Sequence, residues 1–97
     1  MAAPEITLAT TLVASPDQVS ANVAGESVIL GMKDATYYGL DPVGTRIWEL
    51  LQAPKVLGDV VTVITEEFEV SREQAAADLL AFVADLHAHG LVEIAGP

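Results

Sequence analysis

The chain has 97 residues, which is enough for one domain and too few for a second core. Its 52% hydrophobic and 19% charged residues exclude a disordered chain. Four Lys and Arg against 14 Asp and Glu give a net charge of −10, which repels phosphate backbones and argues against nucleic acid as a partner.

Several other classes are excluded by what the chain lacks. Without Cys there can be no disulfide bond, thiolate metal site or cysteine nucleophile. Residues 1–4 lack the basic start of a signal peptide, and no apolar run approaches the roughly 18 residues of a membrane span. We therefore expect a cytoplasmic protein with no membrane partner.

The first 15 residues are expected to form an N-terminal arm or an edge strand. Their apolar residues, Ile6, Leu8, Leu12 and Val13, are scattered among Thr and Ala without a clear period. Residues 15–17 then favour a turn. We accordingly place the domain proper at residues 16–97.

Three strands are predicted over residues 18–40. Val19, Ala21 and Val23 alternate with polar residues, as in a half-buried strand. Residues 27–33 are apolar on both faces, which suits the middle of a sheet, and residues 36–40 are rich in β-forming types. Short turns between them predict an antiparallel meander whose last strand lies on an open edge.

Two helices are predicted next. Asp41 is a good N-cap and Pro42 suits the first helical position, so a helix is expected over 43–52. Apolar residues recur at helical spacing over 57–68 and predict a second helix.

The start of a third helix has the strongest local signal. Ser71 and Gln74 have the spacing of a capping box, and Val70 and Ala75 that of a hydrophobic staple. The helix is expected to continue to about residue 89, with Gly90 suited to the left-handed position after its end.

The order of these elements predicts the fold class. Three antiparallel strands followed by three helices indicate an α+β domain of the winged helix-turn-helix type. Residues 91–94 are long enough to add a short final strand.

No catalytic or metal-binding arrangement is found, and no cofactor is predicted. His87 and His89 would point about 200° apart on a helix, so they cannot bind one metal together. The carboxylates of the second helix fall on its polar face and at its end, and there is no glycine-rich phosphate loop. The third helix carries three acidic residues that would oppose its entry into a DNA groove, namely Glu73, Asp78 and Asp85.

A peptide-binding groove is predicted between the open edge strand and the third helix. Unpaired N–H and C=O groups of residues 36–40 would let an extended peptide add as a fourth strand. Tyr37 and Tyr38 point to opposite faces, so either one of them faces the groove or both are ordinary sheet residues. The helix positions that are not fully committed to the core would form the pockets: Ala76, Leu80, Val83 and Ala84.

Three segments of the chain resemble a known family. They are YYGLDPVGTRIWELL, VVTVITEEFEV and DLLAFVADLHAHGLVE. They are similar to the leader-recognition domains of ribosomally made, modified peptides, such as the PqqD peptide chaperone of pyrroloquinoline quinone biosynthesis. The resemblance covers residues 19–92. The run 37–41 with Gly44 and Trp48 looks most like the stand-alone recognition subunit of lasso-peptide biosynthesis. Asp41 replaces the asparagine that is usual before the first helix in quinone-pathway members.

This resemblance implies a non-catalytic subunit that binds the leader of a precursor peptide as an added strand. Its partners would be a cysteine protease that removes the leader and a cyclase that closes the ring. Lasso leaders carry a tyrosine and a proline that enter hydrophobic pockets.

The resemblance also implies roles for individual residues. By position, Tyr37, Tyr38 and Gly39 would pair with the leader, and Arg72 with Asp78 would hold its polar groups. The remaining predicted contacts are apolar: Leu40, Ala76, Leu79, Leu80 and Val83. Val83→Asp is accordingly expected to abolish leader binding while preserving the fold.

Two alternatives stay open at this point. The first is a PqqD-like peptide chaperone that serves a radical SAM enzyme. The second is an acidic winged-helix regulator that binds another protein.

Overall fold

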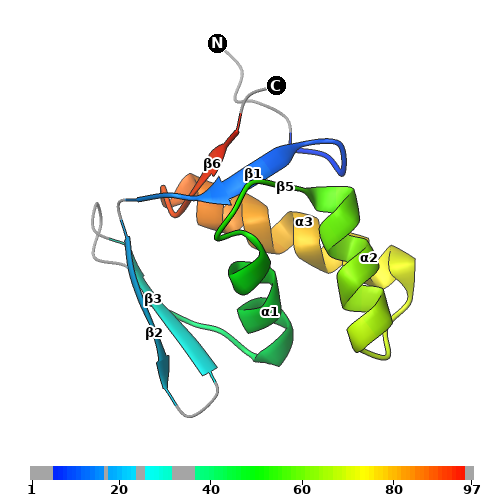
Figure 1. Cartoon of the computed structure of the whole chain (residues 1–97), viewed down its shortest axis with the longest axis horizontal. Helices are drawn as coiled ribbons and strands as arrows, with labels where there is room; N and C mark the ends of the chain where they lie inside the picture. Colours follow the sequence, from blue (N-terminus) through cyan, green and yellow to red (C-terminus); the bar gives the residue numbers. More distant parts are fainter. Residues whose placement is uncertain (1–5, 17, 24–25, 32–36, 96–97) are drawn as a thin grey trace.

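In the computed structural model, three antiparallel strands of one sheet are followed along the chain by three helices (Figure 1). Strands β2 (Gln18–Val23), β3 (Glu26–Gly31) and β4 (Tyr37–Gly39) pair in the order β2-β3-β4. The structure describes residues 6–16, 18–23, 26–31 and 37–95, and within these three strands it describes the burial of Val28, Ile29 and Gly39. The predicted meander, its open edge at β4 and the α+β fold class are confirmed.

A second sheet joins the beginning, middle and end of the chain. Strand β1 (Thr11–Ala14) lies between β5 (Lys55–Val56) and β6 (Val92–Ile94). The expectation of an arm or edge strand is therefore wrong for β1, whose Leu12 is 0% exposed. The partners of β1 are far away in the sequence, so no local pattern predicted that β1 would be the central strand of a sheet. The final strand β6 was predicted, and β5 was not.

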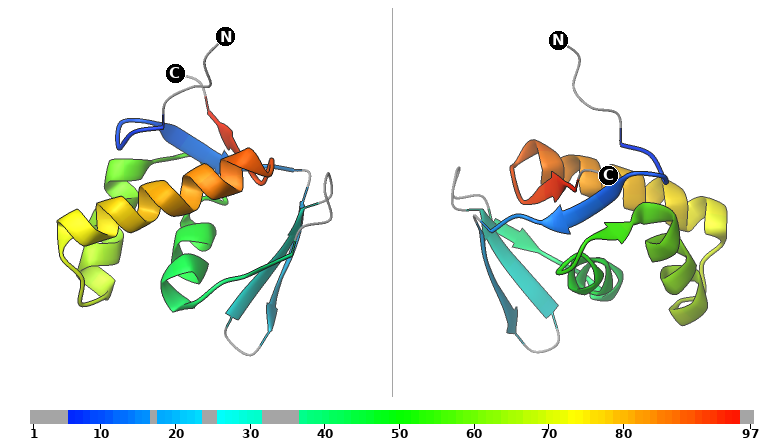
Figure 2. Two further views of the ribbon diagram at one scale, coloured as in Figure 1. Left: turned by 180° about the vertical axis from the view of Figure 1, so that it is seen from behind. Right: turned by 45° about the horizontal axis from the view of Figure 1, so that its top comes forward.

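The first helix, α1 (Pro42–Leu50), begins where its sequence indicates. The Asp41 side chain caps it, since Asp41 Oδ1 accepts a hydrogen bond of 2.7 Å from the backbone N–H of Gly44. In both views of Figure 2, α1 lies between the β2-β3-β4 sheet and α2. The helix thus separates this sheet from α2.

The second helix, α2 (Leu57–Glu67), has no side-chain cap at its start. The backbone N–H of Leu57 donates to the carbonyl of Thr10 at 3.0 Å, and that of Gly58 donates to the carbonyl of Leu8 at 2.8 Å. These bonds satisfy two N–H groups that a helix start leaves unpaired. The segment before β1 therefore completes the first turn of α2.

The third helix, α3 (Arg72–Ala88), confirms its predicted boundaries. Ser71 Oγ accepts from the Gln74 N–H at 3.1 Å, and Gly90 has the left-handed φ of 73°. The Gln74 side chain does not return to Ser71, because its Nε2 donates to Asp78 Oδ1 at 2.8 Å. Only one half of the capping box is therefore formed.

The cap of α3 gives a first testable prediction. Ser71→Ala removes the acceptor of the Gln74 N–H, so the free energy of unfolding should fall by about 1 kcal/mol. For a domain of this size that corresponds to a melting temperature lower by roughly 4–8 °C. Ser71→Asp is the control, because aspartate is an equally good cap. A thermal melt in which both variants lose the same stability would contradict the assignment.

The core is formed where the three helices meet the β1 sheet and β3. It includes Leu12, Ile29, Trp48, Val61 and Val83, each at most 3% exposed. In the parts of the chain that the structure describes, no helix combines the length and apolar character that a membrane crossing requires.

Candidate functional site

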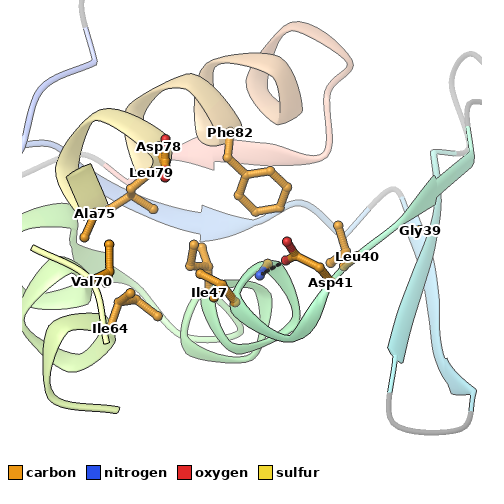
Figure 3. A pocket seen from close by; sticks show the side chains of 12 residues that line it. Gly39, Leu40, Asp41, Ile47, Ile64, Val70, Ala75, Asp78, Leu79 and Phe82 are labelled. Atoms are coloured by element: carbon orange, nitrogen blue, oxygen red, sulfur yellow. Dashed lines mark hydrogen bonds between the residues drawn. The ribbon is translucent and has the colours of Figure 1, made fainter. Parts of the chain in front are cut away.

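A pocket of about 470 Å³ lies between the end of β4 and helices α1 and α3 (Figure 3). Figure 3 shows α3 on one side of the pocket and α1 on the other, with Gly39 and Leu40 at one end and Ile64 and Val70 at the other. The volume falls within the range of about 300–1,000 Å³ that is usual for ligand sites. Its lining residues are Gly39, Leu40, Asp41, Val43, Gly44, Ile47, Ile64, Val70, Ala75, Asp78, Leu79 and Phe82.

Four residues of α3 line the pocket, and they lie on one face of the helix because they are three, one and three positions apart in the sequence. Ala75 and Leu79 are buried, Phe82 is half-buried, and Asp78 is exposed. Figure 3 shows the side chains of Ala75, Leu79 and Phe82 on the side of α3 that faces α1. Asp78 and Leu79 were predicted as site residues from the sequence, whereas Ala75 and Phe82 were assigned to the core.

The other predicted α3 residues lie outside this face. Ala76 and Leu80 are half-buried and pack against the core. Val83 is 0% exposed and belongs to the core itself, so its predicted place beside the groove needs correction. The sequence placed the face about one residue too far along the helix, because small and aliphatic residues surround α3 on most sides.

The strand side of the pocket is open at Gly39. A Cβ atom added there would meet no heavy atom within 4 Å, and Gly39 lines the pocket directly. Leu40 is buried and lines it as well. The side chains of Tyr37 and Tyr38 lie outside the described residues. Their backbones pair with Leu30 and Ile29 of β3, which leaves the outer edge of β4 at the margin of the sheet.

Helix α1 contributes lining residues that sequence reasoning missed. Val43 and Ile47 lie on its apolar stripe, and Asp41 and Gly44 form its capped first turn. The apolar stripe of α1 predicted that these residues are buried, but it did not indicate that some of them line a pocket. Val70, which the sequence predicted to be part of the hydrophobic staple at the start of α3, also lines the pocket.

Neither described arginine lines the pocket. Arg72, predicted to hold polar groups of a ligand, turns to α2, where Nη1 donates to Thr62 Oγ1 at 3.0 Å and Nη2 lies 3.5 Å from the Gly58 carbonyl oxygen. Arg46 donates from Nε to Glu67 Oε1 at 3.0 Å and from Nη2 to Oε2 at 3.0 Å. The hydrogen bonds to Glu67 raise the pKa of Arg46 above its usual value.

Metal chemistry finds no support in the described ranges, where three or more His, Asp or Glu side chains nowhere gather as ligands for an ion. His89 Nε2 lies 3.8 Å from Asp85 Oδ1 on the last turns of α3. The described lining of the pocket thus consists mainly of apolar side chains, the end of β4 and the carboxylates of Asp41 and Asp78.

Two solved structures are similar to this chain. One is TbiB1 in complex with the TbiA(beta) leader peptide, with 36% identity over 88% of this chain and 99% of that chain and a TM-score of 0.77. The other is a lasso peptide synthetase B1 complexed with the leader peptide, with 25% identity over 84% of this chain and 96% of that one and a TM-score of 0.68. No curated protein sequence matches the chain.

A family model also matches. The model described as coenzyme PQQ synthesis protein D (PqqD) aligns with residues 26–92, from β3 to the first residue of β6. This range contains β4 and all three helices, and therefore every element that lines the pocket. Because the match covers well over half of the sequence, the chain belongs to the PqqD family.

Proposed function

We propose that this chain binds the leader segment of a ribosomally synthesised precursor peptide, of the lasso-peptide type, as a strand added to the outer edge of β4. The observation that carries the proposal is the pocket between that edge and α3. Backbone groups of Tyr37 to Gly39 would give affinity that is independent of ligand sequence. The adjacent pocket would accept a bulky apolar side chain of the leader.

Both similar structures support this proposal. Each is a complex with a leader peptide, and each aligns with more than four fifths of this chain. The similarity to a lasso peptide synthetase B1 favours the lasso type over a chaperone for a radical SAM enzyme, which the family match alone would also suit.

The residues proposed to contact the leader are those that the pocket brings together. From the predicted set these are Gly39, Leu40, Asp78 and Leu79, together with the backbone of Tyr37 and Tyr38. Ala75, Phe82 and the α1 residues Val43 and Ile47 join them. Ala76 and Leu80 would act indirectly, by supporting α3 from the core side.

The chain would act without chemistry of its own. We propose that it delivers the bound leader, in the cytoplasm, to a partner cysteine protease that removes the leader and to a cyclase.

Direct binding tests the function. A fluorescently labelled TbiA(beta) leader peptide should bind the chain saturably in a polarisation titration, and a scrambled peptide of the same composition should not. The leader of a precursor encoded beside the gene for this chain is the second probe. If neither leader binds at tens of micromolar, with circular dichroism showing a folded chain, leader capture is contradicted.

A further inference from the structure

Two carboxylates face an otherwise apolar pocket. Asp41 and Asp78 are its charged lining residues, and both are exposed. Each uses Oδ1 within the chain, Asp41 for the Gly44 N–H and Asp78 for Gln74 Nε2. Among the described residues, the second oxygen of each has no hydrogen-bond donor. Both carboxylates therefore keep acceptor capacity for a ligand.

No cation within the described residues neutralises these two charges. Arg46 binds Glu67, and Arg72 donates to Thr62 on α2. Lys55 lies on β5, in the other sheet, opposite Leu12. The chain as a whole carries a net charge of −10, so its own field adds to the negative potential at the pocket.

We propose that Asp41 and Asp78 select a peptide with a Lys or Arg close to the apolar side chain that fills the pocket. The inference rests on the peptide-binding function proposed above, and it specifies that the bound peptide carries a positive charge at this place. An apolar side chain that enters the pocket takes water away from both carboxylates, and a ligand cation compensates for that loss. A ligand carboxylate at the same place is repelled, so the pair acts mainly on specificity.

The position of the two residues suits this role. Asp41 comes from the first turn of α1, and Asp78 comes from α3 on the opposite side (Figure 3). The apolar residues Ile47 and Leu79 lie deeper, since both are at most 3% exposed. A basic side chain would therefore lie at the opening while its apolar neighbour fills the base.

Isosteric variants separate charge from structure. Asn equals Asp as an N-cap, so Asp41→Asn keeps the start of α1. Asp78→Asn keeps an oxygen that accepts from Gln74. The matched control is Glu66→Gln with Glu93→Gln, which removes the same charge from two exposed residues outside the pocket.

The experiment is selection of a random peptide library displayed on phage against three folded proteins: the wild type, Asp41→Asn/Asp78→Asn, and the Glu66→Gln/Glu93→Gln control. We expect the wild type and the control to enrich peptides with Lys or Arg at a fixed spacing from an aromatic or aliphatic residue. The double Asn variant should lose that preference. The best wild-type peptide should bind the double Asn variant roughly fivefold more weakly, and added salt should reduce this difference.

The other outcomes overturn the proposal in distinguishable ways. Apolar peptides enriched without a basic residue, or the same basic preference in all three proteins, would remove the charge selection and leave peptide binding intact. If the wild type enriches no peptide at all, the proposed function fails, and the charge selection fails with it.

Discussion

Gly39→Phe should strongly weaken leader binding while leaving the free energy of unfolding close to that of the wild type. A Cβ at Gly39 meets nothing within 4 Å, so the fold has room for a side chain there. Because Gly39 lines the pocket, we expect an aromatic ring at this position to compete with the ligand side chain. We expect the affinity to fall by roughly 30-fold or more, which corresponds to about 2 kcal/mol.

A graded series at the same position supplies the control. Gly39→Ala adds one methyl group and should weaken binding only slightly, whereas Gly39→Val should lie between Ala and Phe. Polarisation titrations give the affinities, and thermal melts show whether the fold survives. Equal affinity for the wild type and the Phe variant would remove this pocket from the leader site.

Val83→Asp should unfold the chain, in contrast to the expectation from sequence that it would remove leader binding alone. Val83 is 0% exposed and belongs to the core formed by the helices and the β1 sheet. A carboxylate in that place would lose its hydration, which is costly for a charged group. The free energy of unfolding should fall by about 4 kcal/mol or more, a large part of the stability of a small domain.

The matched control is the next residue along α3. Ala84 is exposed, so Ala84→Asp should keep the melting temperature within a few degrees of the wild type. Urea denaturation followed by the fluorescence of Trp48, the single Trp, compares the two variants. A folded Val83→Asp variant of normal stability would show that the core packing of α3 is misassigned.

Local signals explain why α3 was predicted well and its groove face was not. The boundaries of the helix depend on Ser71 and Gly90, whose effects are confined to one turn. The groove face depends on where α1 and β4 leave α3 uncovered. Since Ala, Leu, Phe and Val occupy most sides of α3, two neighbouring stripes were equally consistent with the sequence, and only the packing of the other elements distinguishes them.

The β1 sheet shows a second limit of sequence reasoning. Four residues with mixed composition look like an irregular arm, yet Leu12 pairs with Lys55 on one side and with Ile94 on the other. Such pairings join segments from the beginning, middle and end of the chain. The meander of β2, β3 and β4 was predictable because its partners are neighbours in the sequence and its turns are short.

The backbone cap of α2 has a consequence for the order of folding. Leu8 and Thr10 provide acceptors for Gly58 and Leu57, which lie far along the chain. Closing so long a loop costs conformational entropy and is slow compared with winding a helical turn. We therefore expect the body of α2 to form early and its first turn to become complete only when the N-terminal segment has docked, which couples β1 and α2 in the final, cooperative step of folding.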